Sequence, residues 1–348
     1  MNKLRTGPWN LTDLKDVKPN GMKVFSCFHC GGGSTMGYKL AGYEVLGGVE
    51  IDPEMSEIYV KNHKPKYEYL MGVQKFKNIP DDELPKELFN LDILDGSPPC
   101  SSFSMSGSRE KKWGKKNKFR EGQAEQVLDD LFFDFIDIAN KLKPKVVVAE
   151  NVKGLLQGNA RGYVKQIFNK FKAIGYDVQL FLLNSAAMGV PQRRERIFFI
   201  ANKIRAPKLT MEFNEKPIAV KTVINTSINK KYLSRKDLEI WKWCKNNNEK
   251  CGGKAHTKLY GKRARFNVVT LKSNEPSSTL IANLSLLHWD EPRHLTDSEV
   301  VSLSSFPLDY KCKKIKYVCG MSVPPFMMQR ISYQIYKQWL LPYKNKAV

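Results

Sequence analysis

The sequence predicts an α/β fold in which a mostly parallel sheet carries helices on both faces and a small basic domain is attached. Short β-branched or aromatic runs alternate with segments of helical periodicity, which is typical of such a sheet. The 348 residues suffice for one large domain and a smaller one. Near the middle of the chain the alternation gives way to a segment rich in Lys and Arg.

The predicted elements follow this alternation along the chain. Strands are expected at residues 22–28, 44–52, 91–96, 144–152, 176–184 and 195–202. Helices are expected at residues 31–43, 125–142 and 163–175, then after a capping Thr296 and from a proline start in "GMSVPPFMMQRISYQIYKQWL". The ligands of such sheets lie at the carboxyl ends of the strands.

A separate module is predicted over residues 206–288, within a main domain formed by residues 1–205 and 289–348. Its periodicity is weak, and the stretch from Asn229 to Arg265 holds 12 Lys and Arg against 3 Asp and Glu. The whole chain has a formal net charge of +22, which indicates a polyanionic partner, nucleic acid first and an anionic membrane second.

The amino-terminal sequence has no apolar signal-peptide core, and no apolar run approaches the roughly 20 residues that span a bilayer. A soluble, cytoplasmic protein is therefore expected, with no membrane partner. The seven cysteines do not form the pattern of a disulfide framework. Cys27 and Cys30 could begin a zinc site, but no second tight pair completes it, so no metal is expected.

The first glycine-rich turn, "HCGGGSTMG", follows a predicted strand and opens a helix. Its backbone N–H groups and small residues would admit a nucleotide-like ligand, and Glu50 ends the next strand, where an acid can meet ribose hydroxyls. Because Cys30 stands where a pyrophosphate fingerprint has its first glycine, a cofactor without pyrophosphate fits equally well. The alternative is a turn that needs glycine only for packing.

Three further motifs carry side chains suited to catalysis. Cys100 follows two prolines that fix the backbone before it, which suits a nucleophile, although a buried apolar cysteine is the alternative. Glu150 ends a strand, where burial can make it a proton donor; a capping or ion-paired Glu is the alternative. Arg193, Arg194 and Arg196 precede another strand and could hold a phosphate or a base edge, unless they form only a solvated edge.

The segment from Arg109 to Gly122 contains seven Lys and Arg against two Glu, with Trp113 and Phe119 between them. We expect a loop that closes over a polyanion, or a loop that is merely solvated.

In combination and order, these motifs resemble those of the carbon-5 cytosine methyltransferases. The stretches "GSPPCSSFSMSG", "ENV", "QRRER" and "GMSVPP" carry the resemblance, which extends from about Val24 to Leu340 with a gap across the basic module. It implies a Rossmann-like S-adenosylmethionine-dependent methyltransferase sheet with a target-recognition domain at 206–288. It further implies a monomer that flips a cytosine out of double-stranded DNA, with a restriction endonuclease as a possible companion.

The resemblance also implies roles for individual residues. Cys100 would add to carbon 6 of the cytosine, Glu150 would act at ring nitrogen 3, and Arg194 and Arg196 would position the base. The methyl donor would bind to a set of residues near the strand ends: Phe28, Gly31, Gly32, Gly33, Glu50, Ile51, Pro99 and Ser322.

Cys30, Val73 and Met321 depart from the usual pattern of the family at positions near the cofactor. A transfer-RNA methyltransferase of the same family and a catalytically weak DNA-binding relative are the alternative functions. A zinc-binding regulator built on Cys27 and Cys30 is a third.

Overall fold

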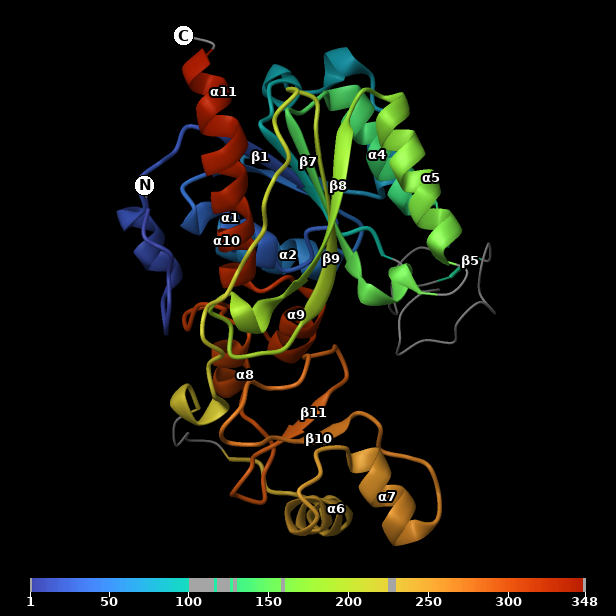
Figure 1. Cartoon of the computed structure of the whole chain (residues 1–348), viewed down its shortest axis with the longest axis vertical. Helices are drawn as coiled ribbons and strands as arrows, with labels where there is room; N and C mark the ends of the chain where they lie inside the picture. The colour runs from blue at the N-terminus through green and yellow to red at the C-terminus, as the bar shows by residue number, and fades with distance from the viewer. Residues whose placement is uncertain are drawn as a thin grey trace.

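The computed structural model describes residues 2–99, 116–117, 126–127, 130–157, 160–224 and 230–346. A seven-stranded sheet in the order β3-β2-β1-β4-β7-β9-β8 forms the centre of the larger lobe (Figure 1). Its strands are β1 (Lys23–Cys27), β2 (Glu44–Glu50), β3 (Tyr67–Leu70), β4 (Ile93–Gly96), β7 (Val146–Val152), β8 (Asp177–Asn184) and β9 (Glu195–Asn202).

All six predicted strands are present, and the sheet is mostly parallel. The exception is β9, which pairs antiparallel with both of its neighbours, β7 and β8. The seventh strand, β3, was not predicted, because its four residues, "YEYL", are only partly buried and show no apolar run. The predicted α/β fold class is confirmed.

Helices cover both faces of the sheet, as the alternation of elements predicts. One hydrophobic cluster packs against α1 (Gly33–Leu40), α2 (Pro53–His63) and α10 (Pro325–Ile335). A second cluster, on the opposite face, packs against α3 (Val73–Phe76), α4 (Leu131–Leu142) and α5 (Ala160–Ala173). Because these helices cover the two faces of the sheet, the ends of its strands remain available for a ligand-binding site.

The helix predicted over residues 125–142 begins later than expected. In the structure α4 starts at Leu131, and the short strand β6 (Gln126–Val127) pairs antiparallel with β5 (Lys116–Asn117). The side chains that α4 buries, among them Phe135 and Ile136, all lie from Leu131 onward. In the described part of the chain, the apolar face that packs this helix against the sheet begins at Leu131.

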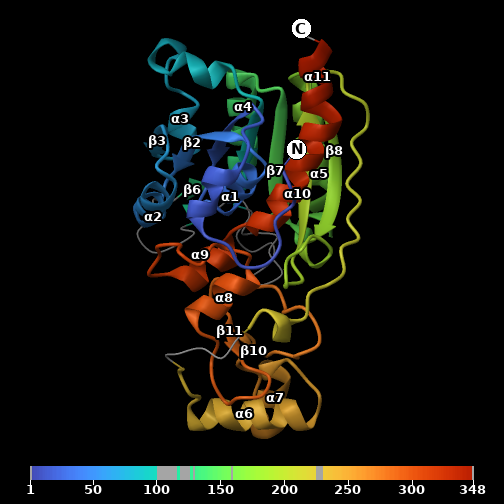
Figure 2. The same cartoon turned by 90° about the vertical axis from the view of Figure 1, so that its left-hand side faces the viewer.

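A smaller lobe lies below the sheet in Figures 1 and 2. It contains α6 (Arg235–Asn246), α7 (Gly252–Tyr260), and the two parallel strands β10 (Val268–Thr270) and β11 (Ser285–Leu287). It has a hydrophobic cluster of its own, made of Ile240, Trp241, Cys244, Ala255, Val268 and Leu287. In the figures α8 (Asp297–Leu303) and α9 (Ile315–Met321) lie between this lobe and the sheet.

Two predicted helix starts are confirmed near the carboxyl-terminal end. Thr296 caps α8 and forms a capping box with Glu299, and Pro325 occupies the first turn of α10. The chain continues through a π-helical turn (Tyr336–Leu340) into α11 (Leu341–Lys346). Within the described part of the chain, no helix is both long and apolar enough to cross a membrane.

Candidate active site

The candidate site residues meet at one edge of the sheet because the strands that precede them are neighbours. β4 pairs with β1 on one side and with β7 on the other, all in parallel. The turn after β1, the acid at the end of β2, the prolines after β4 and the acid at the end of β7 therefore lie along one line of strand ends.

The segment before Cys100 is fastened to the end of β7. Gly96 is paired with Ala149 in the sheet, and the buried Asn151 Nδ2 donates a hydrogen bond to the carbonyl oxygen of Pro98 over 3.2 Å. Cys100 itself lies outside the described residues, as does the segment 101–115 that follows it. The contact between Asn151 and Pro98 nevertheless places the chain just before the thiol beside Glu150.

Glu150 is buried and forms an ion pair with Arg196, whose Nε lies 3.0 Å from Oε1 of the carboxylate. The two strands bring them together, since Glu150 on β7 and Arg196 on β9 lie two register positions apart in antiparallel pairing. Burial lowers the pKa of Arg196, while the charge and hydrogen bond of Glu150 act in the opposite direction. The ion pair therefore engages Oε1 of the Glu150 carboxylate.

Arg194 occupies a different environment from Arg193. Burial lowers the pKa of Arg194 to about 9, which keeps it charged at neutral pH. Its Nη1 donates to the carbonyl oxygen of Leu280, whereas its buried Nε has no hydrogen-bond partner among the described residues. Arg193 is exposed and pairs with Glu275. Only one of these two arginines therefore lies inside the site.

The glycine-rich turn between β1 and α1 is closely packed. A Cβ on Gly31 would collide with Val318, one on Gly32 with His63, and one on Gly33 with the carbonyl oxygen of Val323. Gly32 also has a positive φ of 78°. Packing thus requires these glycines whether or not a ligand binds, so only the neighbouring groups indicate a cofactor.

Glu50 holds this turn from the end of β2. Its Oε2 accepts a hydrogen bond from the Cys30 N–H, and its Oε1 accepts from the N–H groups of Ile51 and Asp52, each over 2.9 Å. A carboxylate has about four lone-pair positions, so roughly one remains on Oε2 for a ribose hydroxyl. Sequence reasoning predicted the ribose contact but not the three backbone hydrogen bonds.

Ser322 places a hydroxyl group beside the glycine-rich turn. Its hydroxyl oxygen is buried and has no hydrogen-bond partner within the described ranges. It lies close to Gly33, because a Cβ at that glycine would be 3.3 Å from the Ser322 Oγ. Half-buried Phe28, with a positive φ of 57°, begins the same turn. An unsatisfied hydroxyl beside a turn and an acid fits a nucleoside ligand with polar substituents.

Asp95, which the sequence analysis did not single out, is buried at the end of β4. Ser26 Oγ donates to its Oδ2 over 2.8 Å, and the Tyr38 hydroxyl donates to its Oδ1 over 3.2 Å. Burial raises the pKa of Asp95 to about 7, these hydroxyls act against the rise, and the charge of Glu150 adds to it. The sequence offered one signal for this residue, because Asp95 is an acid near the end of the apolar run "LDILDG".

Cys27 and Cys30 do not converge on a common point. Cys27 is buried in the cluster on the α4 face of the sheet, whereas Cys30 packs against the cluster on the α1 face. Burial raises the pKa of the Cys27 thiol above its usual value. In the described part of the chain, no group of three or more His, Cys, Asp or Glu side chains is arranged to hold a metal ion.

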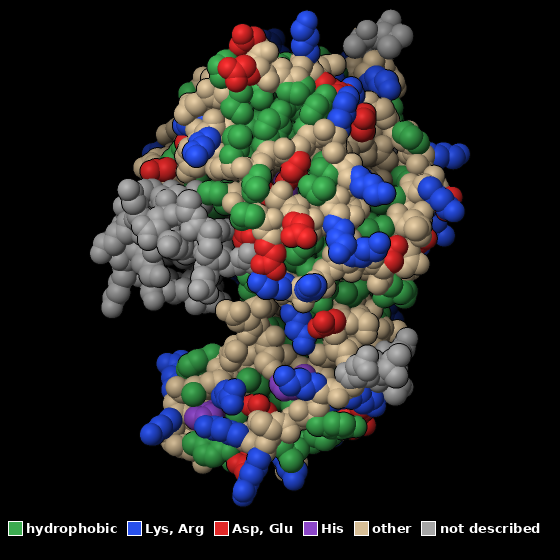
Figure 3. All heavy atoms as spheres, turned by 180° about the vertical axis from the view of Figure 1, so that it is seen from behind, with side chains coloured by type: hydrophobic (Ala, Val, Ile, Leu, Met, Phe, Trp, Pro, Cys, Tyr) green, Lys and Arg blue, Asp and Glu red, His purple; other side chains and the backbone are tan. Residues whose placement is uncertain are grey.

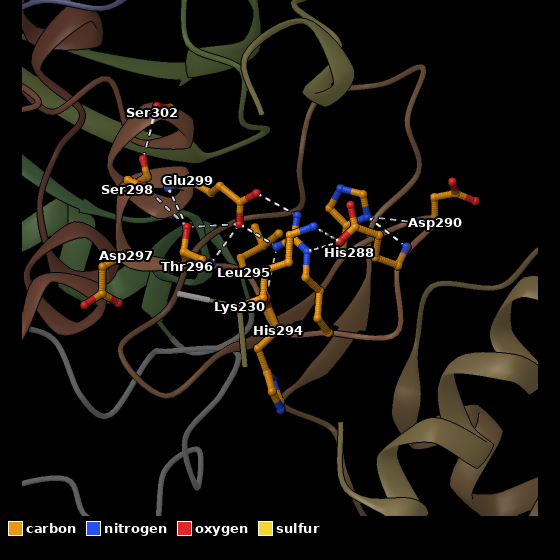
Figure 4. Close-up of polar contacts among 12 residues, drawn as sticks. Lys230, His288, Asp290, His294, Leu295, Thr296, Asp297, Ser298, Glu299 and Ser302 are labelled. Atoms are coloured by element: carbon orange, nitrogen blue, oxygen red, sulfur yellow. Dashed lines mark hydrogen bonds and ion pairs between the residues drawn. The ribbon is translucent and has the colours of Figure 1, made fainter. Parts of the chain in front are cut away.

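The junction of the two lobes contains a buried ion-pair cluster. Arg293 is completely buried and donates from Nη1 and Nη2 to the two carboxylate oxygens of Glu299, each over 2.9 Å. Its Nε donates to Glu291. Figure 4 shows Glu299 between Thr296 and the loop that carries His288. The Glu299 carboxylate therefore serves both the cap of α8 at Thr296 and Arg293, which lies on the segment that returns from the smaller lobe.

The smaller lobe has a basic surface, and Figure 3 shows Lys and Arg side chains over it, with a hollow where it meets the larger lobe. The exposed basic residues between 230 and 265 are Lys231, Arg235, Lys236, Lys242, Lys245, Lys254, Lys258, Lys262, Arg263 and Arg265. This distribution suits contact with a polyanion.

Comparison with known proteins agrees with this geometry. The family model described as C-5 cytosine-specific DNA methylase matches residues 22–337. The chain is 36% identical over 179 residues to the Type II methyltransferase M.FnuDI of Fusobacterium nucleatum, a match that covers 51% of this chain and 46% of that protein. It is 29% identical over 332 residues to M1.HphI of Haemophilus parahaemolyticus, covering 89% and 85% of the two chains.

The fold is similar to that of a solved Escherichia coli protein, a putative DNA modification methyltransferase encoded within a prophage. The TM-score is 0.67 at 21% identity, and the match covers 91% of this chain and 99% of that one. The Rossmann-like methyltransferase sheet implied by the motifs is confirmed. With a family match over most of its length, the chain belongs to the C-5 cytosine-specific DNA methylase family, the DNA (cytosine-5-)-methyltransferases that the order of its motifs predicts.

Proposed function

We propose that this protein transfers a methyl group from S-adenosylmethionine to carbon 5 of a cytosine in a short sequence of double-stranded DNA. The observation that supports this most directly is the hydrogen bond from Asn151 to Pro98, which holds the chain before Cys100 against the strand end that carries Glu150. The family match over residues 22–337 supplies the substrate class. A target base inside a duplex must be flipped out to reach such a site.

In this proposal Cys100 is the nucleophile. Its thiolate adds to carbon 6 of the cytosine, which makes carbon 5 nucleophilic. After carbon 5 has gained the methyl group, its proton is lost to water, the double bond between carbons 5 and 6 re-forms, and the bond between carbon 6 and sulfur breaks to release the thiolate. Glu150 hydrogen-bonds or protonates ring nitrogen 3 and so stabilises the charge that develops during the addition. Arg196 holds the Glu150 carboxyl in place by their 3.0 Å ion pair. The buried Arg194, whose Nε has no partner in the described part of the chain, is available to orient the base or its backbone.

S-adenosylmethionine would supply an electrophilic methyl group when bound. The proposed ligands are the turn residues Phe28, Gly31, Gly32 and Gly33, with Glu50 and Ile51 on the nucleoside side and Pro99 and Ser322 completing the site. Two groups support this assignment: the Ser322 hydroxyl, which has no hydrogen-bond partner among the described residues, and the remaining lone pair of Glu50. Gly72 lies against Ile51. The residue after Gly72 is Val73, which stands in the segment where the family usually has an acid.

We further propose that residues 206–288 form the target-recognition domain. Exposed lysines and arginines on α6 and α7 support phosphate contacts, which provide affinity but little sequence information. We propose that the protein acts as a monomer in the cytoplasm. Since relatives are Type II methyltransferases, a restriction endonuclease of the same specificity is a proposed companion.

The test is transfer of labelled methyl from S-adenosylmethionine to unmethylated duplex DNA and, separately, to transfer RNA. We expect methyl on carbon 5 of cytosine at one short DNA motif, lost in Cys100→Ala and strongly reduced in Glu150→Gln. Cys312→Ala, a half-buried cysteine outside the site, is the matched control and should retain activity. Transfer only to RNA would support the transfer-RNA alternative, and binding without transfer would support the DNA-binding alternative.

A further inference from the structure

Three aromatic rings contact one another at the turn of residues 28–33. The ring of His29 is stacked on that of Tyr59, with centroids 3.7 Å apart and planes inclined by 25°. Tyr59 also contacts His63 in a tilted arrangement, with centroids 4.7 Å apart and planes inclined by 44°. We call His29, Tyr59 and His63 the ring cluster. Because Tyr59 and His63 belong to α2, the ring cluster joins this helix to the turn.

Both ring nitrogens of His29 face oxygen atoms. Nδ1 lies 3.0 Å from the carbonyl oxygen of Cys30, and Nε2 lies 3.1 Å from Oε1 of Glu68 on β3. A backbone carbonyl can only accept a hydrogen bond, and an ionised carboxylate likewise only accepts. Two N–H groups are needed to satisfy both, so the geometry describes an imidazolium. Ser56 Oγ also donates to the same Oε1 of Glu68, over 2.6 Å.

His63 has the opposite arrangement. Its Nε2 lies 3.3 Å from the carbonyl oxygen of Gly31, while its buried Nδ1 has no partner among the described residues. Burial lowers the pKa of His63 well below its usual value, so this ring is neutral. The Tyr310 hydroxyl donates to the same Gly31 carbonyl. Two consecutive carbonyl groups of the turn are thus held by ring side chains behind it.

The backbone on either side of His29 needs such support. Phe28 has a φ of 57° and Cys30 a φ of 48°, left-handed conformations that are unfavourable for residues with a side chain. The His29 ring itself is pressed against β2, since a Cβ on Gly48 would lie 2.6 Å from its Cδ2. Strained residues persist only where the surroundings hold them, and His29 lies between the two.

We propose that His29, as an imidazolium paired with Glu68, is a positioning residue that holds the turn in the conformation required by the methyl donor. This inference rests on the proposed function for the role of the turn, but not for the charge of His29. The charged and titratable groups that face His29 are Glu68 on β3, Glu50 on β2, and Tyr59 and His63 on α2. The two carboxylates favour the imidazolium, and the neutral His63 does not oppose it.

The first test uses the full-length protein without any ligand. With five histidines in the chain, ring ¹⁵N chemical shifts can be assigned by comparison with His29→Gln. Both ring nitrogens of His29 should be protonated at neutral pH and, in Glu68→Gln, one should lose its proton. A neutral His29 ring in the wild type at neutral pH would overturn the proposal, whatever the protein's activity.

The second test is calorimetric binding of S-adenosylhomocysteine across the pH range. Glu68→Gln should bind roughly tenfold more weakly at neutral pH, because a charge-assisted hydrogen bond is replaced by a neutral one. Glu87→Gln is the matched control, since Glu87 pairs with Lys23 and Lys66 at the far end of the same strands and should bind as the wild type does.

The pH dependence separates positioning from a general loss of structure. Burial alone lowers the pKa of His29, but Glu68 and Glu50 raise it above its usual value. The pair's contribution should therefore be complete below about pH 6.5 and disappear as the pH rises through the folded-state pKa. In the wild type, affinity should fall over that range, and the Glu68→Gln curve should stay flat.

Parallel curves for wild type and Glu68→Gln would overturn the positioning role. If the wild type binds no S-adenosylhomocysteine at all, the proposed function fails and the positioning role fails with it. The ring-nitrogen spectra would still decide whether His29 is an imidazolium paired with Glu68.

Discussion

Asn151 and Pro98 are joined by a buried hydrogen bond of 3.2 Å that connects the ends of two neighbouring strands, β7 and β4. The amide that follows the candidate acid, Glu150, therefore orients the segment that leads to the candidate nucleophile, Cys100. The rate of a reaction depends strongly on the distances between the catalytic groups. A contact that holds the segments carrying two such groups together would therefore serve catalysis without touching the substrate.

Replacement of Asn151 by Ala should impair both stability and the covalent step. It leaves the Pro98 carbonyl buried without a donor, which costs about 1–3 kcal/mol in the free energy of unfolding. The loosened segment should slow trapping of the enzyme by duplex DNA that contains 5-fluorocytosine. Asn184→Ala, at the end of β8, removes a cap from a short helical turn and should leave trapping unchanged. Wild-type trapping by Asn151→Ala would contradict this role.

The ion pair of Arg196 and Glu150 should show strong energetic coupling. Their side chains are only 14% and 11% exposed, and removing one member of such a pair leaves a charge without compensation, at a cost of about 3–5 kcal/mol. Arg196→Leu and Glu150→Leu should each destabilise the protein more than the double variant does. Urea unfolding of all four proteins measures this coupling. Additive effects would mean that the two side chains do not interact in solution.

Asp95 should make stability fall as the pH rises. Its folded-state pKa, about 7, lies above the usual value of 3.8, so the folded state holds this proton more tightly than the unfolded state. Stability from this group is complete below the unfolded pKa and decreases up to about pH 7, by about 1.4 kcal/mol for each unit of pKa shift.

Asp95→Asn should remove that decrease, because an amide does not ionise in this range. Unfolding curves measured between acidic and neutral pH, with wild type and variant compared at each pH, give the difference. If the two profiles are parallel, Asp95 does not titrate in this interval, and its three hydroxyl neighbours, Ser26, Tyr38 and Ser34, keep it ionised.

Arg293→Met should destabilise the junction of the lobes by about 3–5 kcal/mol, since it leaves the buried Glu299 without its cation. Salt should change the effect little, because a buried pair is poorly screened. The matched control is Arg235→Met, since Arg235 is almost fully exposed and pairs weakly with Glu239. Its free energy of unfolding should equal that of the wild type. Equal losses in the two variants would contradict the importance of burial.

Much of the fold could be predicted because its signals are local. The runs that form β1, β4 and β7 are apolar and short, and the cap at Thr296 and the proline at Pro325 mark helix starts within a few residues. The strand β3 and the start of α4 could not be located in this way. β3 pairs with β2 at the edge of the sheet, and α4 begins at Leu131, after the short strand β6.

The family could be recognised from the sequence alone, since the order of the motifs around Cys100, Glu150 and Arg194 is a property of the linear chain. The folded chain is needed to show which residues meet: Glu150 with Arg196, Ser322 with Gly33, and His29 with Glu68. These contacts depend on which strands are neighbours and on which groups lose their water. Neither can be read from spacing along the chain, because partners distant in sequence are brought together by the packing of the whole sheet.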